Sequence, residues 1–270
     1  MSQVELFTAA QVLDSGIKIP SPPALLTEMN ALLDAPEINI PHVARAIGRD
    51  AGATAMLFKL AGSPMFGGRK VPDSVEGVIN MLGLTTVADL VRGLMLRSTL
   101  SGPPPFYEWF WERSDAIADL AGTLAKNLRG TGISPSQARL AGMFMHCGIL
   151  LIAQKHADYY TTFQAPGGFA YRWPDVRAAN ARLNTDHTVV GSLVAKHWKL
   201  PSQIAEAILH HHAAQIEDPA TGKLVALLQI AAHAYALQHQ DEDSGWPEVA
   251  SQVLERLHLS DDELVDLLDQ

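Results

Sequence analysis

The residues of this chain best suited to chemistry are its histidines. There are eleven of them among 270 residues, and a neutral imidazole is a good metal ligand as well as a proton carrier near neutral pH. Several helices could direct such side chains to one centre. Six histidines lie in or beside apolar segments with helical spacing: His146, His187, His210, His211, His212 and His233. None of their local spacings is a metal signature alone, because the sequence has neither a His-Glu-x-x-His nor a Cys-x-x-Cys motif.

His146 and Cys147 stand side by side in the apolar stretch "MFMHCGILLIA" (143–153). A helix that is apolar on all sides is buried, and a buried imidazole needs a carbonyl, a water or a metal as its partner. Cys147 is the only cysteine of the chain, and its simplest role is that of a small apolar core residue. Nothing around it predicts a reactive thiolate.

The run "HHH" (210–212) cannot supply three ligands from one helix, because neighbouring side chains diverge by about 100° around the axis. At most two of these rings can face a common centre. The alternative is a solvated helix end, where imidazoles lie near the negative end of the helix dipole. His187 and His233 each lie in an apolar stripe, so a hydrogen-bonded core position is the competing interpretation for both.

Helices must position these side chains, since helical spacing of apolar residues dominates the chain and no period-2 run or Asn-Gly hairpin turn is found. The sequence therefore predicts an all-α protein, with Asp50 and Asp186 as N-caps. The predicted helices cover 21–34, 39–50, 50–62, 74–83, 85–100, 107–128, 135–159, 175–183, 187–199, 200–213 and 222–240, and one or two more lie in the acidic tail. The sharpest break is "SGPPPF" (101–106), where three successive prolines cannot continue a helix, and we predict a subdomain boundary there.

Composition restricts the class of protein. Apolar residues make up 47% and the formal net charge is −9, which indicates a globular fold with no basic surface for nucleic acid. One cysteine cannot form an internal disulfide, which favours a reducing compartment. We find no signal peptide and no uninterrupted apolar window long enough to span a membrane, so we expect a cytoplasmic protein.

Several segments together resemble an HDOD domain, a bacterial signalling module related to the HD superfamily of metal-dependent phosphohydrolases. The resemblance covers about 15–215 and leaves 216–270 as a C-terminal helical extension that we expect to pack on the domain. It implies an N-terminal helical subdomain packed on an HD-like helical subdomain. The matching segments are "IPSPPALLTEMNALL", "IGRDAGATAMLFKLAGSPMF", "VEGVINMLGLTTVADLV" and "HWKLPSQIAEAILHHH".

The resemblance also implies where a metal site would lie. HD hydrolases use a first His, a His-Asp pair and a distant Asp, and some subfamilies add further histidines. The first His falls at Arg113 or Ser114, and the pair falls on His146 and Cys147. The added histidines match His187 and the pair His211–His212, and the distant Asp falls loosely at His233. Asp115 is the only carboxylate near the first position that could substitute.

These departures imply a degenerate site, so we expect no metal and no cofactor, and a non-enzymatic regulatory domain that binds a signalling protein or a small ligand. The alternative is a metal-dependent phosphohydrolase of nucleotides or cyclic dinucleotides. We expect the remnant cavity to favour an anionic or nucleotide-like ligand; its expected residues are Arg113, His146, His187, His211, His212 and His233. A second alternative is a zinc site, for which the expected ligands are His146, Cys147, His187, His211 and His233.

The stretch "PPPFYEWFW" places five aromatic residues together after the break. We expect most of them to belong to the core, and an exposed pair would mark a partner site. They are Phe106, Tyr107, Trp109, Phe110 and Trp111.

Overall fold

A computed structural model describes residues 8–268, apart from 67–69, 103, 129, 165–170, 172, 174–179, 182, 184, 242 and 244. The fold is all-helical, as predicted. In the described part of the chain the only β pairing is an isolated bridge between Gln164 and Tyr171. The helix predicted at 175–183 lies mostly outside the described residues, although Asn180 and Ala181 are helical.

The chain divides into two compact units. One unit comprises 20–101 together with 197–199, and the other comprises 1–19, 102–196 and 200–270. The chain passes from the first to the second between Ser101 and Gly102, beside the break that the prolines predict. The next helix begins at Pro104, before the predicted start at residue 107. Prolines are tolerated in the first turn of a helix, so the helix includes part of the triple proline.

Among its described residues, the smaller unit holds five α-helices and a short 3-10 turn. They are α2 (Ala24–Leu33), α3 (Ile40–Gly48), α4 (Ala51–Ala61), η1 (Pro64–Phe66), α5 (Val75–Leu82) and α6 (Leu84–Thr99). As predicted, Asp50 caps α4 by accepting a hydrogen bond from the Ala53 amide at 2.8 Å. Inside this unit the buried side chain of Arg92 pairs with Asp89 at 3.1 Å and donates to the Oδ1 atom of Asn30 at 3.3 Å.

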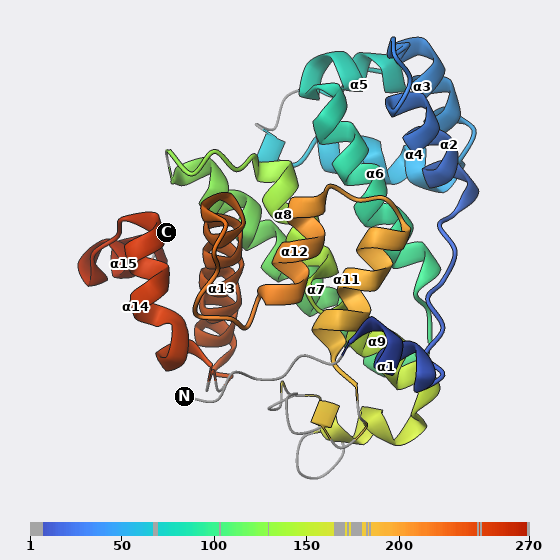
Figure 1. Cartoon of the computed structure of the whole chain (residues 1–270). Helices are drawn as coiled ribbons and strands as arrows, with labels where there is room; N and C mark the ends of the chain where they lie inside the picture. The colour runs from blue at the N-terminus through green and yellow to red at the C-terminus, as the bar shows by residue number, and fades with distance from the viewer. Residues whose placement is uncertain are drawn as a thin grey trace. The chain divides into compact units, whose positions relative to one another are not determined.

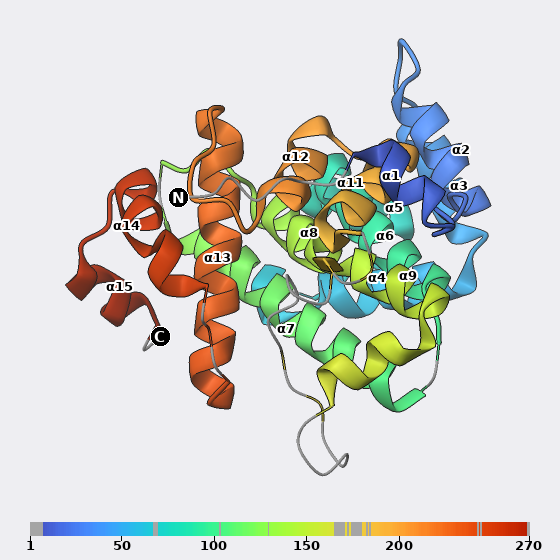
Figure 2. The same cartoon turned by 60° about the horizontal axis from the view of Figure 1, so that its bottom comes forward.

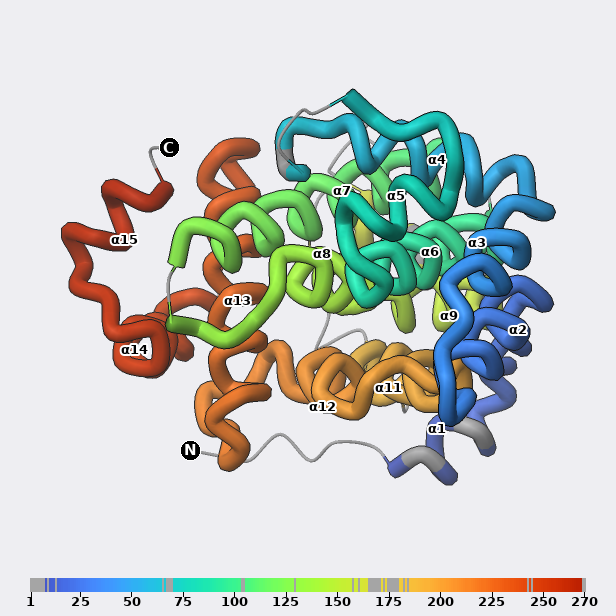
Figure 3. Tube along the Cα trace, turned by 90° about the horizontal axis from the view of Figure 1, so that it is seen from above, coloured from blue at the N-terminus to red at the C-terminus, as the bar shows by residue number. Residues whose placement is uncertain are grey.

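The larger unit contains the histidines of interest. Its elements are α1 (Ala9–Asp14), α7 (Pro104–Asn127), α8 (Pro135–Met145), α9 (Cys147–Lys155), η2 (Ala157–Phe163), α11 (His187–His197), α12 (Ser202–His210), α13 (Pro219–His239), α14 (Trp246–Leu257) and α15 (Asp261–Leu268). Helix α13 packs against α7, α8 and α12 on one side and α14 on the other, as Figures 1 and 2 show, and Figure 3 gives the same order from above.

Two segments of this unit, 135–155 and 219–239, are long and apolar enough to cross a membrane by length and composition. Within the protein, 94% of the apolar window of the first and 72% of that of the second are buried. Packing inside the helical core therefore accounts for their composition.

The single helix predicted over 135–159 is interrupted at His146. This residue has φ −111° and ψ 7°, outside the α-helical region, and it ends α8 and precedes α9. Apolar residues continue through the break, so the hydrophobic pattern carries no sign of it. The consequence is that His146 lies at a junction of two buried helices.

Candidate functional site

Four histidines gather at one place in the larger unit. His146 comes from the junction of α8 and α9, His187 is the first residue of α11, and His211 and His212 follow the end of α12. Each offers a ring nitrogen, and these four nitrogens lie within 4.8 Å of one another. We call these four residues the histidine cluster.

Close backbone packing brings the elements of the histidine cluster together. A methyl group added at Gly148 would lie 2.1 Å from the carbonyl oxygen of His187, so the start of α9 touches the start of α11. A methyl group at Gly191 would lie 3.0 Å from the Ile208 side chain, so α11 also approaches α12 closely. At Gly148 only glycine permits the contact, because the neighbouring atom belongs to the backbone, and this contact brings the start of α11, with His187, against the junction that carries His146.

The Nε2 atoms of three rings converge. The Nε2 of His187 lies 3.3 Å from the Nε2 of His211 and 3.2 Å from that of His212. Away from this point, the Nδ1 atom of His211 donates to the Ile208 carbonyl at 2.7 Å. A neutral imidazole carries one proton, so the Nε2 of His211 is a free lone pair that faces the centre.

The Nδ1 atom of His187 is held by a second pair of side chains. It lies 2.8 Å from the Nδ2 atom of Asn180, and the Tyr159 hydroxyl donates to the Oδ1 atom of Asn180 at 2.9 Å. All three side chains are buried. Sequence patterns gave no sign of Tyr159 or Asn180, because their roles come from side-chain contacts that the spacing of apolar and polar residues does not reveal.

Burial keeps three of the four rings uncharged. His146, His187 and His211 are at most 4% exposed, and burial lowers the pKa of each well below its ordinary value, with repulsion between the neighbouring imidazoles acting in the same direction. Protonation is therefore disfavoured, and neutral imidazole is the form that binds metal ions. His212 is the exposed member, so solvent reaches the cluster from its side.

Arg113 lies beside the cluster, where the sequence placed the first HD ligand. It is 5% exposed, and its guanidinium carbon lies 3.8 Å from the centre of the Trp173 ring. His146 contacts the same ring, at 4.4 Å between ring centres. Burial lowers the pKa of Arg113 to about 10, so the group stays cationic at neutral pH and repels a proton on His146.

Cys147 does not belong to the cluster. Its side chain is fully buried and faces Gly191, where an added methyl would lie 3.5 Å from its Sγ atom. Burial raises the pKa of the thiol to about 12, so it is protonated at neutral pH. The prediction that this cysteine is an unreactive core residue agrees with its surroundings.

The carboxylates near the site have other partners. Asp115 lies 3.8 Å from the Arg139 guanidinium, on the face of α7 toward α8. Asp186 accepts a hydrogen bond from the Thr188 amide at 2.7 Å, which confirms it as the cap of α11. Its carboxylate lies 3.9 Å from the Nδ1 atom of His187, on the side of that ring away from the Nε2 centre. Neither enters the group of ligand atoms found among the described residues.

His233, which we expected in the same cavity, has a different environment. Its ring stacks on Trp246 at 4.1 Å, and its Nδ1 atom lies 3.0 Å from a carboxylate oxygen of Asp243. It is not a member of the group that His146, His187, His211 and His212 form in the described structure. Helix α13 has apolar residues on every side. Its sequence pattern therefore does not indicate which of its residues faces the histidine cluster, and the position of His233 could not be predicted from it.

The five aromatic residues after the break belong mainly to the core. Phe106, Tyr107, Phe110 and Trp111 are buried. Trp109 is partly exposed and contacts Trp173 at 6.2 Å between ring centres. These aromatic side chains therefore support the wall of the site that carries Trp173.

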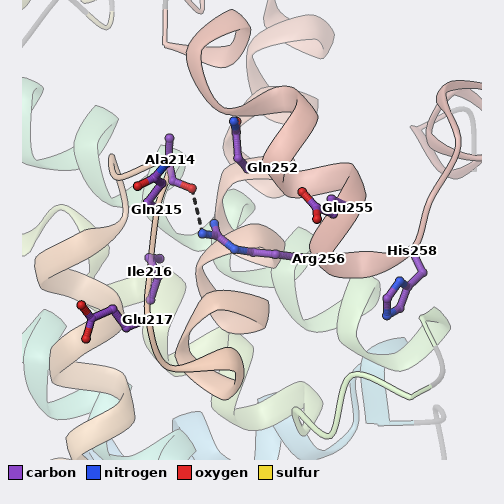
Figure 4. A pocket seen from close by; sticks show the side chains of 8 residues that line it. All are labelled: Ala214, Gln215, Ile216, Glu217, Gln252, Glu255, Arg256 and His258. Carbon is purple, nitrogen blue, oxygen red and sulfur yellow. Dashed lines mark hydrogen bonds between the residues drawn. The ribbon is translucent and has the colours of Figure 1, made fainter. Parts of the chain in front are cut away.

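A separate hollow of about 790 Å³ lies between 214–217 and α14 (Figure 4). Arg256 reaches across it and donates to the Ala214 carbonyl at 2.8 Å. The other side chains that line it are mostly exposed, and none belongs to the histidine cluster. The cluster, with its converging buried nitrogens, is therefore the candidate site.

Residues 19–214 match the family model described as the HDOD domain. The chain belongs to the HDOD family. Helical HDOD architecture was thus predicted correctly from the segments quoted above.

Solved structures share this HDOD fold. An HDOD domain protein of unknown function from Geobacter sulfurreducens is 22% identical with a TM-score of 0.69, covering 95% of this chain and 90% of its own. A protein named "Putative phosphohydrolase" from Shewanella amazonensis SB2B is 21% identical with a TM-score of 0.71, and the match covers 97% of this chain and 93% of that one.

The chain is also similar in sequence to an uncharacterized protein of Treponema pallidum (strain Nichols). The two are 21% identical over 207 residues, which are 76% of this chain and 39% of that protein.

The HDOD chain does not fit the metal centre of the related HD hydrolases. In the resemblance described above, that centre depends on a carboxylate that can bridge two ions and hold the attacking water, and the resemblance places this carboxylate at Cys147, whose side chain faces Gly191. The resemblance places the first ligand at Arg113 or Ser114, and the buried guanidinium of Arg113 adds positive charge beside the cluster, which disfavours two adjacent divalent ions more strongly than one. The four residues that do gather offer nitrogen only, a ligand set that suits borderline ions such as zinc, copper or nickel.

Proposed function

We propose that this HDOD protein is a non-catalytic regulatory domain that acts in the cytoplasm by binding a signalling protein or a small anionic ligand. One observation carries the proposal: the group of ligand-capable atoms contains imidazoles only, and the position of the pair's acid is a buried, protonated thiol. The membership of the HDOD family supports a signalling role.

Hydrolysis of a phosphoester needs neutralisation of the phosphate charge and an activated water. A bridging carboxylate serves both needs in a dinuclear centre, because it holds two ions at the distance that one phosphate can span. The histidine cluster has no such group among the described residues, and its imidazoles, with lowered pKa values, are weak proton acceptors.

Arg113 supports an anionic ligand. A buried guanidinium carries several donors that match phosphate or carboxylate oxygens, and its Nε atom has no hydrogen-bond partner among the described residues. Trp173, in contact with both Arg113 and His146, offers an aromatic face on which a base could stack. The net charge of −9 disfavours nucleic acid as the partner.

The competing function is metal-dependent hydrolysis of nucleotides or cyclic dinucleotides. It is favoured by the gathering of His146, His187, His211 and His212 and by the name of the Shewanella structure. One assay distinguishes the regulatory function from the hydrolytic one. Protein supplied with magnesium, manganese, iron(II) or zinc is incubated with nucleoside phosphates and cyclic dinucleotides, and the released phosphate or linear product is measured.

We expect turnover no higher than that of a His146→Ala variant for every pair of metal and substrate. Metal-dependent turnover that His146→Ala abolishes would overturn the proposed function. A circular dichroism spectrum of the variant checks that it is folded, so that a loss of activity is not mistaken for unfolding.

A further inference from the structure

We propose that the histidine cluster binds a single borderline divalent ion, of the zinc class, through nitrogen ligands alone, and that Asn180 and Tyr159 set the state of His187 on which binding depends. This site goes beyond the proposed function, because the ion is a cation in addition to the protein or anionic ligand proposed there; it rests on that function in one respect, that the ion is not a hydrolytic cofactor. The ligands are the Nε2 atoms of His187, His211 and His212, with a ring nitrogen of His146 completing the set.

The spacing of the ligand atoms fits a tetrahedral ion. Zinc–nitrogen bonds of about 2.0–2.1 Å place neighbouring ligand atoms of a tetrahedron about 3.3 Å apart. The Nε2 of His187 lies 3.3 Å from that of His211 and 3.2 Å from that of His212. The fourth ring, His146, brings a nitrogen within 4.8 Å of the other three, so a small rotation of its side chain completes the shell.

The chemistry of the ligands selects the class of ion. Four neutral imidazoles bring no negative charge, so magnesium, calcium and manganese, which prefer oxygen ligands, are disfavoured. Three of the rings are buried, so few water molecules compete with their nitrogens for the ion. The exposed edge at His212 gives the ion a path from solvent.

The His211 ring is already oriented as a metal ligand. Its Nδ1–H donates to the Ile208 carbonyl at 2.7 Å, which leaves Nε2 free to bind. Metal-binding histidines commonly hold the second ring nitrogen in this way, with a backbone carbonyl or a carboxylate as the acceptor.

His187 is in the opposite state. Tyr159 donates to the Oδ1 of Asn180, so the Nδ2 of Asn180 donates to the Nδ1 of His187. The proton of His187 then lies on Nε2 and points at the free Nε2 lone pair of His211. This arrangement closes the network without metal, because a protonated Nε2 cannot bind an ion.

Metal binding therefore requires the Asn180 amide to turn by about 180°, so that its oxygen accepts a proton from the Nδ1 of His187 and its nitrogen donates to the Tyr159 oxygen. The pair Tyr159–Asn180 thus stabilises the metal-free tautomer and weakens binding. Aspartate at position 180 offers acceptors to both neighbours without any rotation, which favours the metal-binding tautomer.

The experiment compares untagged, chelator-treated protein with three variants in titrations with zinc chloride followed by calorimetry, and with cobalt(II) followed by visible absorption. His212→Ala removes a ligand that is exposed to solvent. Loss of an outer-shell partner commonly costs about 10- to 100-fold in metal affinity, so loss of a direct ligand should lower the zinc affinity by about 100-fold or more. His210→Ala is the matched control. The Nε2 atom of His210 lies 3.6 Å from the Glu206 carboxylate, and His210 is outside the histidine cluster. The zinc affinity of this variant should therefore equal that of the parent protein.

Asn180→Asp should bind zinc about 10-fold more tightly than the parent, with one ion per chain and the strong visible bands of tetrahedral cobalt. Absence of zinc binding by the parent protein, equal losses in His210→Ala and His212→Ala, or an Asn180→Asp variant that is folded but binds zinc no more tightly would each overturn the inference.

Phosphate release measured on the same zinc-loaded sample separates the two proposals. Zinc binding without release supports both of them. Absence of both zinc binding and release overturns only the metal site, whereas metal-dependent release overturns the proposed function whatever the affinity.

Discussion

His187 and His211 face each other through their Nε2 atoms at 3.3 Å, and both rings are buried. Their other nitrogens are held differently: His211 donates to the Ile208 carbonyl, whereas His187 accepts from the Asn180 amide. One ring therefore presents a lone pair and the other presents a proton. The measurable properties of the site follow from this difference.

Metal-free protein should lose stability in acid. Burial holds the pKa values of His146, His187 and His211 well below the usual 6.5, so these rings stay neutral in the native state while the unfolded chain takes up protons below that pH. Stability present above pH 6.5 is then lost as pH falls, by about 1.4 kcal/mol per pH unit for each ring. Urea unfolding between pH 7.5 and 5 measures this slope.

The control for this slope is His42→Gln, at an exposed position of the smaller unit, which should keep the parent profile. A urea midpoint that does not fall between pH 7 and pH 5 would show that the rings are not held neutral by burial.

Gly148→Ala should disrupt the site and the fold together. The new methyl group would lie 2.1 Å from the His187 carbonyl oxygen, so α9 and α11 must separate, at a cost of about 1–3 kcal/mol or more. Gly48→Ala is the matched control, because nothing lies within 4 Å of the added atom. Thermal unfolding of both variants should show a lower midpoint for Gly148→Ala only, and equal midpoints would refute the close approach.

Cys147→Ser should lower stability without changing zinc stoichiometry. A hydroxyl in this fully buried position costs about 1–3 kcal/mol if it lacks a hydrogen bond, while the Sγ atom is not among the gathered ligand atoms. Urea unfolding and metal analysis are read on the same preparation. Loss of zinc together with stability would restore the cysteine as a ligand.

Arg113→Met should separate anion binding from stability. Replacing a buried charge by an apolar side chain of similar size is often neutral or stabilising, so the unfolding midpoint should stay or rise. Stabilisation by pyrophosphate or nucleoside diphosphates, measured as a thermal shift, should disappear. A variant that keeps the full shift would show that these anions do not bind at Arg113.

Much of the fold follows from local sequence signals. Asp50 and Asp186 act as the predicted caps, and the apolar spacing predicts helices close to their observed bounds. The break at His146 was not predicted, because the apolar residues of α8 continue into α9 without a proline at the junction and the nearby Gly148 also fits inside a helix. Local patterns describe helices well and describe an interruption inside a buried segment poorly.

The site was predicted in part. The sequence identified His146, His187, His211 and His212, and helical geometry correctly limited "HHH" to two inward rings. It also included His233, whose partners are Trp246 and Asp243. Asn180 and Tyr159 were missed, because their roles arise from tertiary contacts that leave no trace in residue spacing.

The histidine cluster is tested most directly by the number and identity of the ions that untagged protein binds after equilibration with a mixture of zinc, manganese, iron(II) and magnesium, determined by inductively coupled plasma mass spectrometry. We expect one zinc ion per chain, lost in His212→Ala and kept in His210→Ala. Two iron or manganese ions per chain would contradict this expectation, because they would require the bridging carboxylate that the histidine cluster lacks.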